Sequence, residues 1–132
     1  MSDEVEALER GYTMLWREGR PEEAVRALAD DFEWVVPRHP EGEVRHGPEG
    51  MLEFIREWTE PWEELEVEWR FEQGAPDRVL AIIDMRGRGS GSGVPTDMQF
   101  WQLWTFRGGK AIRMELHWDE DDARHAAGLS EP

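Results

Sequence analysis

Residues 65–72 read Leu-Glu-Val-Glu-Trp-Arg-Phe-Glu, so large apolar residues alternate with charged ones. A period of two places successive side chains on opposite faces of a β-strand. The stretch therefore predicts a strand with one dry and one wet face, as in an antiparallel sheet that covers a core on one side only.

Three more strands are predicted after this one. Residues 79–84 are apolar on both faces and predict a central strand, whereas residues 97–106 are long and aromatic. Two glycines at 108–109 have the composition of a tight hairpin turn, and residues 111–118 predict the last strand. The four strands would follow one another as a meander.

The residues before the first of these strands predict helices. Residues 3–16 carry apolar side chains at helical spacing, with Asp3 as the expected cap and Gly19 as the stop. Pro21 is expected to begin a second helix that ends at Asp30, followed by a short strand.

A third helix is predicted between two prolines. Residues 38–43 have a loop composition, Pro48 lies in the first turn of the helix, and Pro61 limits its end. After the last strand, Asp119 is the expected cap of a short closing helix. The predicted class is α+β: a roll in which a strongly bent, mixed or antiparallel sheet holds three helices from the N-terminal half on its concave side.

Composition limits the function classes. The chain has 132 residues, which suits one domain over residues 1–132, and no cysteine, which excludes disulfides and thiolate metal sites. Fifteen Lys and Arg against 30 Asp and Glu give a net charge of −15. This charge repels phosphate backbones and anionic membranes, so we expect neither nucleic acid nor a membrane as partner. Eight tryptophans and 39% hydrophobic residues argue for a folded core.

The amino terminus is acidic and lacks the apolar region of a signal peptide. No apolar run approaches the roughly 20 residues that span a bilayer. A cytoplasmic protein is the expectation that follows.

Four segments, at residues 15–19, 28–34, 45–50 and 103–110, resemble the nuclear transport factor 2-like superfamily in its SnoaL-like and ketosteroid-isomerase-like branch, and most closely its bacterial SnoaL-like proteins. They follow one another in the family's order. The resemblance implies a cone with an apolar pocket between sheet and helices, and a homodimer through the outer sheet face. It implies no single reaction, because the group shares architecture and not chemistry.

The family's catalytic residues can be compared with this chain position by position. Tyr12 falls at the helix tyrosine of ketosteroid isomerases, but Val36 falls at their base and Gln102 at their late-strand acid. Leu116 falls at the last-strand acid of the cyclases, and Asp119, in a similar His-Trp-Asp string, comes three residues too late. The resemblance therefore does not imply steroid isomerase activity, and the usual family acids are missing.

Asp84 and Arg86 are the charged residues that stand out in an otherwise apolar strand. Their spacing predicts one shared face, together with Leu80 and Ile82, and we expect that face to be the pocket side. A carboxylate in an apolar pocket has a raised pKa and can act as a base. The alternative is an ion pair near the end of the strand.

Tyr12 and Gln102 are the other catalytic candidates, as polar groups that hold a ligand; the alternatives are a core aromatic and a structural hydrogen bond. His39, in a loop, is a candidate proton carrier or simply an exposed histidine. No histidine spacing matches a metal site, so no metal and no cofactor is expected. Trp69 and Trp101 are expected to face outward and mark a dimer surface.

The remaining predicted ligand contacts are apolar residues expected on the inner face, for which core packing is the alternative. They are Trp16, Trp34, Val36, Phe54, Trp58, Leu80, Ile82, Phe100, Trp104, Met114, Leu116 and Trp118, with Arg86 and His39 as the polar members.

The predicted function is binding of a small hydrophobic molecule, such as a cyclic ketone or a polyketide-like compound. If the molecule is transformed, proton transfer or hydration of an isomerase, cyclase or hydrolase type is expected, with Asp84 as base. The alternative that stays open is a ligand-binding or dimeric interaction module without turnover.

Overall fold

The structure is a computed structural model that describes residues 2–37 and 43–129. Its elements, in chain order, are α1 (Asp3–Trp16), α2 (Pro21–Val25), β1 (Leu28–Val35), β2 (Val44–His46), α3 (Gly47–Thr59), β3 (Trp62–Gln73), β4 (Arg78–Gly89), β5 (Pro95–Arg107), β6 (Lys110–His117) and α4 (Glu120–Ala126). In the described part of the chain, no helix is long and apolar enough to cross a membrane.

Six strands form one curved sheet in the order β2-β1-β6-β5-β4-β3. The predicted meander is confirmed, because β3, β4, β5 and β6 pair as antiparallel neighbours. β1 then lies parallel to β6, and β2 pairs antiparallel with β1. The sheet is therefore mixed, and the predicted α+β class is confirmed.

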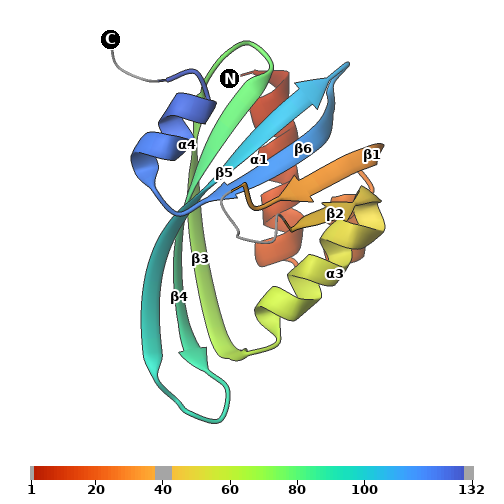
Figure 1. The fold of residues 1–132 in the computed structure, drawn as a ribbon. Helices are drawn as coiled ribbons and strands as arrows, with labels where there is room; N and C mark the ends of the chain where they lie inside the picture. The colour runs from red at the N-terminus through yellow and green to blue at the C-terminus, as the bar shows by residue number, and fades with distance from the viewer. Residues whose placement is uncertain (1, 38–42, 130–132) are drawn as a thin grey trace.

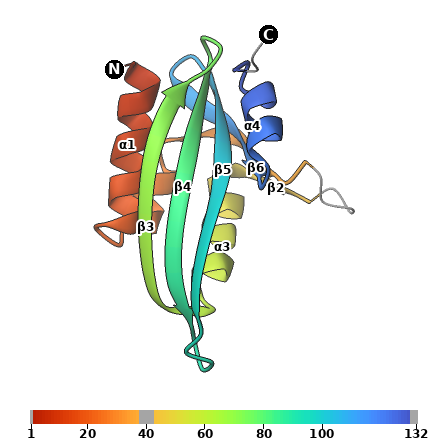
Figure 2. The same cartoon turned by 90° about the vertical axis from the view of Figure 1, so that its left-hand side faces the viewer.

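The N-terminal helices α1 and α3 lie on the concave side of the sheet (Figure 1). The closing helix α4 packs on the opposite face, beside β5 and β6 (Figure 2). Figure 1 also shows β3, β4 and β5 bending strongly along their length, which lets the sheet curve around α1 and α3. This curvature creates the site described below.

β4 is apolar on both faces because both of its faces are covered. Val79, Ala81, Ile83 and Met85 belong to the main core under the N-terminal helices. Leu80 and its same-face neighbours instead form a second cluster with α4, comprising Leu80, Ile82, Trp101, Leu103, Ala123 and Ala127. The prediction of a central strand is correct. Because both faces of this strand are apolar, the sequence does not show which face lies on the concave side.

Neither of the two tryptophans expected on an exposed outer surface is exposed there. Trp69 points inward, packs against the Tyr12 ring at 5.6 Å between ring centroids, and donates a 2.7 Å hydrogen bond to Glu9 Oε2. Trp101 does face outward, but α4 covers it and leaves it only 8% exposed. Neither ring is therefore available as an exposed aromatic dimer surface.

Local signals at element ends were mostly correct. Gly108 and Gly109 have φ of 58° and 83°, as a tight hairpin turn requires, and Asp119 caps α4 by accepting from Asp122 N at 3.0 Å. The cap of α1, however, is Ser2 rather than Asp3. The second helix ends at Val25, so β1 starts earlier than expected, and the short β2 was not predicted.

A row of ion pairs joins β1 and β6 on the outer face of the sheet. Arg113 lies between two carboxylates, at 3.3 Å from both Glu33 and Glu115, and His117 Nε2 lies 3.4 Å from Glu115 Oε1. His117 is buried and makes an ion-pair contact there without hydrogen-bond geometry at Nε2. His117 and the positive charge of Arg113 lower the pKa of Glu115, against the opposing effect of burial.

We expect Glu115→Gln to make folding less sensitive to acid. A carboxyl group whose pKa is lowered by folding stabilises the folded protein at pH values above its ordinary pKa. This stabilisation is lost as the pH falls through the lowered pKa. At neutral pH the variant should lose about 1 kcal/mol in urea unfolding, and in acid the difference should vanish. Glu63→Gln is the control, because Glu63 is exposed and has no ion-pair partner among the described residues. An equal loss at both pH values would contradict the role of the Glu115 charge.

Candidate functional site

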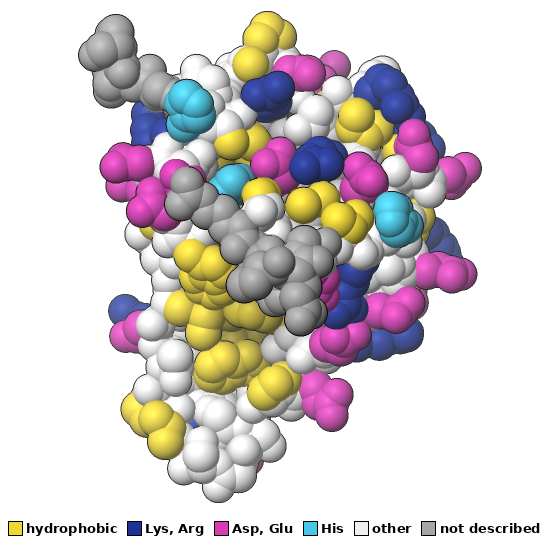
Figure 3. All heavy atoms as spheres, viewed as in Figure 1, with side chains coloured by type: hydrophobic (Ala, Val, Ile, Leu, Met, Phe, Trp, Pro, Cys, Tyr) yellow, Lys and Arg dark blue, Asp and Glu magenta, His cyan; other side chains and the backbone are white. Residues whose placement is uncertain are grey.

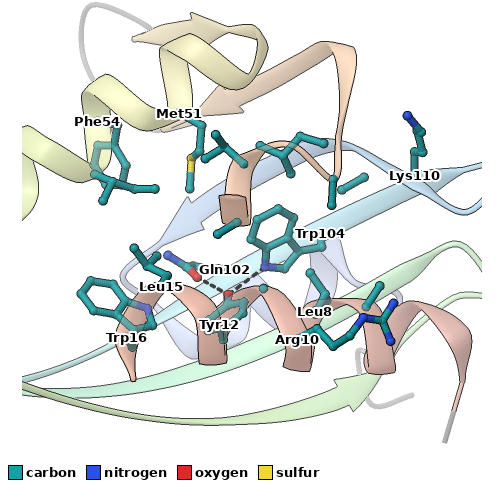
Figure 4. Close-up of a pocket in the computed structure, with 18 of the residues that line it drawn as sticks. Leu8, Arg10, Tyr12, Leu15, Trp16, Met51, Phe54, Gln102, Trp104 and Lys110 are labelled. Carbon is teal, nitrogen blue, oxygen red and sulfur yellow. Dashed lines mark hydrogen bonds between the residues drawn. The ribbon is translucent and has the colours of Figure 1, made fainter. Parts of the chain in front are cut away.

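A cavity of about 320 Å³ lies between the N-terminal helices and the inner face of β5 and β6 (Figure 4). Helix α1 supplies one wall, and α2, α3 and the strands supply the others. Its lining consists of Ala7, Leu8, Arg10, Gly11, Tyr12, Leu15, Trp16, Ala24, Val25, Ala27, Leu28, Met51, Phe54, Ile55, Trp58, Phe100, Gln102, Trp104, Phe106, Gly109, Lys110, Ala111 and Leu116. Volume and lining are those of a small-molecule site rather than of a packing defect.

Small residues keep this space open. The curved sheet holds the helices away from β5 and β6. The small residues on the wall do not fill the space between these elements. These residues are Ala7, Gly11, Ala24, Ala27, Gly109 and Ala111. Gly11 is notable because it lies inside α1, where glycine costs about 1 kcal/mol relative to alanine. A methyl group at Gly11 would meet no atom within 4 Å.

A short hydrogen-bonded chain supplies the polar part of the wall. Trp104 Nε1 donates to the Tyr12 hydroxyl at 2.8 Å, and that hydroxyl donates to Gln102 Oε1 (Figure 4). The three residues come from α1 and from same-face positions on β5, so the helix–sheet packing holds the chain in place. Burial raises the pKa of Tyr12, and the hydrogen bond from Trp104 lowers it by less. Tyr12 is therefore a neutral phenol at physiological pH.

The amide nitrogen of Gln102 is the free end of this chain. Its carbonyl oxygen accepts from Tyr12, which orients the amide, and Nε2 has no hydrogen-bond partner among the described residues. Gln102 is half-buried and lines the cavity. An amide NH₂ offers two donors, so this wall presents donors to an oxygen atom placed inside.

The charges on the wall are of one sign. Among the described residues, Arg10 and Lys110 line the cavity, and no aspartate, glutamate or histidine does. Across the described residues, no group of histidine and carboxylate side chains could hold a metal ion. The described part of the wall therefore offers apolar contact, hydrogen-bond donors and two cations. None of its described side chains is a carboxylate or an imidazole that could act as a general base.

Half of the apolar residues predicted on the inner face line this cavity. The structure brings the two polar candidates, Tyr12 and Gln102, into direct contact and places a group of predicted apolar contacts around them. That group is Trp16, Phe54, Trp58, Phe100, Trp104 and Leu116.

Asp84 and Arg86 do not face the cavity, contrary to expectation. They share a face, as their spacing predicted, but it is the outer one, where Asp84 lies 3.5 Å from Arg70 and accepts a 2.9 Å hydrogen bond from Gln99. Arg86 lies 3.6 Å from Asp97 on the same face. Leu80 and Ile82 face the same way, under α4. The error has one cause: strand alternation gives relative facing, and helix packing alone decides which face is inside.

Other predicted contacts lie close to the cavity without lining it. Trp34 stacks on Phe54 with ring centroids 4.1 Å apart, and Met114 is fully buried in the core. Val36 packs against the edge of that core. His39 lies outside the described residues.

Trp118 extends the aromatic wall to the surface. It is 53% exposed and lies 5.3 Å from Phe100 and 6.3 Å from Trp58 between ring centroids. Figure 3 shows hydrophobic side chains gathered between the sheet and α3. The cavity thus has an aromatic end, bounded by Trp16, Phe54 and Trp58.

Sequence reasoning missed several cavity residues on the helices and those at the β5–β6 turn. Leu8 and Leu15 could have been found from the apolar face of α1, which also carries Tyr12. Arg10 and Lys110 carried no comparable signal, because a charged side chain on a helix or at a turn usually lies in solvent. Only the tertiary arrangement of α1 and the β5–β6 turn around one cavity brings them to the same wall.

Comparison with known proteins agrees with this architecture. The family model for the SnoaL-like domain matches residues 8–114. No curated protein matches the chain in sequence. An NTF2-like protein of unknown function from Burkholderia pseudomallei is 21% identical, with a TM-score of 0.76 over 96% of this chain and 98% of that one.

Two other solved structures are similar over nearly their whole length. TerC, co-crystallised with polyporic acid, is 27% identical, with a TM-score of 0.73 over 98% of this chain and 100% of that one. A protein from Jannaschia sp. CCS1, to which a SnoaL-like polyketide cyclase activity has been provisionally assigned, is 21% identical, with a TM-score of 0.76 over 98% and 94%. With a family match over most of its length, the chain belongs to the SnoaL-like domain family, and its fold is that of NTF2-like proteins.

Proposed function

We propose that this protein binds a small, mostly apolar cyclic molecule that carries a carbonyl or hydroxyl oxygen. The observation that carries the proposal is the unpartnered amide nitrogen of Gln102 in the wall of an apolar cavity. An unpaired polar group that loses contact with water costs about 1–3 kcal/mol, so a ligand that excludes water there must supply an acceptor. A ketone-bearing ring, as in a cyclic ketone or a polyketide-like compound, supplies one.

The aromatic side chains on the wall support a ring system as the ligand body. Trp16, Phe54, Trp58, Phe100 and Trp104 surround the cavity, and aromatic rings pair favourably with other rings beyond the area they bury. TerC, which is 27% identical to this chain, was co-crystallised with polyporic acid. That likeness supports binding of a small organic molecule in the corresponding fold.

Binding is supported better than turnover. Proton transfer needs a titratable group within reach of the substrate, and the titratable groups on the described part of the wall are a neutral phenol and two cations. Isomerase or cyclase chemistry is the second candidate. It is favoured by the Gln102 amide, which can stabilise an enolate oxygen, but no residue on the described part of the wall supplies its base.

The roles of Tyr12 and Gln102 in orienting the ligand oxygen can be tested with two compounds that differ in one hydrogen-bond acceptor. Methyl naphthyl ketone and ethylnaphthalene are similar in shape, but only the ketone accepts a hydrogen bond. We expect calorimetry to show about tenfold tighter binding of the ketone, the equivalent of one hydrogen bond. Because Gln102→Met alone would free the Tyr12 hydroxyl to donate instead, the test uses Tyr12→Phe/Gln102→Met. In this double variant the preference for the ketone should disappear.

Gln99→Met is the matched control, because Gln99 lies on the outer face of the same strand and donates to Asp84 there. It should keep the ketone preference of the natural protein. An unchanged preference in the double variant would place the ligand oxygen elsewhere, and failure of both compounds to bind would argue against the cavity as their site.

A homodimer through the outer sheet face remains a prediction from the resemblance. The part of that face left uncovered by α4 is charged, with Arg86 opposite Asp97 and Arg88 opposite Glu64. A dimer there would be held by complementary charges rather than by exposed tryptophans. Light scattering at low and high salt distinguishes this arrangement, because screening weakens it.

A further inference from the structure

Three cationic side chains stand apart from the other described lysines and arginines. All the others have a carboxylate within ion-pair distance, as expected where acids outnumber bases two to one. Arg10, Arg26 and Lys110 have none among the described residues. Arg10 remains unpaired although Glu6 lies one turn earlier on the same helix. Two of the three, Arg10 and Lys110, line the cavity.

These two cations occupy one end of the cavity. Figure 4 shows Arg10 on α1 and Lys110 on β6 at the same end, on opposite sides of it, with Trp16 and Phe54 at the other end. Both are exposed, so they lie at the surface of the protein rather than in the core. The Tyr12–Gln102 pair lies between the two ends.

The wall is therefore polarised along its length, from two cations through hydrogen-bond donors to aromatic rings. Fifteen excess negative charges repel an anion from the rest of the surface. A neutral ligand would gain nothing from two cations that have no carboxylate partner among the described residues. A ligand oxyanion would form ion pairs with both of them.

We propose that the ligand is an anion; this proposal rests on the proposed function of the cavity. The ring body of the ligand would lie in the aromatic end, and its carbonyl or hydroxyl oxygen would lie at Gln102. A carboxylate or similar oxyanion would lie between Arg10 and Lys110. Arg10 presents a planar fork that can bind two oxygens at once, and Lys110 adds a point charge. The pair thus selects charged ring compounds over their neutral amides or esters.

The test uses a naphthalene with a methyl ketone at one end and a carboxylate at the other, and the same compound with a primary carboxamide in place of the carboxylate. The two probes share shape and ketone and differ in charge. Calorimetry on the full chain should show about tenfold tighter binding of the carboxylate. Arg10→Gln/Lys110→Gln should abolish this preference and leave carboxamide binding within about twofold, because the apolar contacts and Gln102 remain.

The single variants Arg10→Gln and Lys110→Gln should each lose part of the preference. Arg26→Gln is the matched control: it removes the same charge from an unpaired, exposed residue that is off the cavity wall, and should leave the preference intact. Equal affinities of the two probes for the natural protein would overturn the anion proposal but not the proposed function. An equal effect of Arg26→Gln would also overturn it, in favour of general charge attraction. If neither probe binds, the proposed function itself fails.

Discussion

Replacing Gly11 with leucine is expected to weaken ligand binding strongly and at the same time to raise the melting temperature. Gly11 lies inside α1, lines the cavity, and has no atom within 4 Å of the place where a Cβ would stand. A leucine there fills space that the ligand needs. By analogy with overpacked cores, the clash costs a bound ligand about 1–3 kcal/mol, roughly tenfold to a hundredfold in Kd.

The gain in stability has an independent cause. Glycine in a helix interior is about 1 kcal/mol less favourable than alanine, and leucine is nearly as good as alanine. For a chain of this size, 1 kcal/mol corresponds to roughly 4 °C in Tm. Because binding and stability should move in opposite directions, loss of binding could not be attributed to unfolding.

Thr13→Leu is the control for this prediction. Thr13 lies two residues further along α1 and does not line the cavity, so its replacement should leave ligand affinity unchanged. Calorimetry with methyl naphthyl ketone and thermal unfolding of the three proteins provide the data. Undiminished binding to the Gly11→Leu protein would show that the ligand site lies elsewhere.

Replacing Gly74 with alanine should cause the largest loss of stability. A Cβ on Gly74 would lie 2.2 Å from the carbonyl oxygen of Ala127, closer than non-bonded atoms approach. That oxygen accepts a 3.0 Å hydrogen bond from Ala75 N, so it is held in place at the end of α4. The obstacle is backbone rather than a mobile side-chain tip, and relief requires α4 to shift on the sheet.

A shift of α4 would loosen the second core cluster that contains Leu80, Ile82 and Trp101. We expect a loss of about 3 kcal/mol, the upper part of the range for overpacking, and a fall in Tm of roughly 10 °C. Gly11→Ala is the chemically identical control in open space and should be slightly stabilising. Urea unfolding followed by tryptophan fluorescence measures both. A Gly74→Ala protein as stable as the natural one would mean that α4 is only loosely held.

The fold was predictable because its signals are local and periodic. Alternation in residues 65–72, two glycines at a hairpin turn and prolines at helix starts each act within a few residues, and together they predicted the meander of β3 to β6. The short β2 carried no such signal. Its three residues gain their strand conformation from pairing with β1, which is a tertiary contact.

The site was only partly predictable. Tyr12 and Gln102 were found through the resemblance, and the structure joins them by a hydrogen bond. Asp84 was misplaced because strand alternation determines which residues share a face, and cannot say which face the helices will cover. Its neighbours Leu80 and Ile82 are apolar since α4, from the far end of the chain, packs on them.

The sequence by itself determined the class of fold, the order of the elements and the absence of disulfides. It also determined the excess negative charge of the surface. Tertiary structure alone decided which face of β4 lies inside, where the empty space lies, and that Arg10 and Lys110 share one cavity end. The physical reason is that secondary structure follows from neighbouring residues, whereas a cavity forms where curved sheet and helices fail to fill the volume between them.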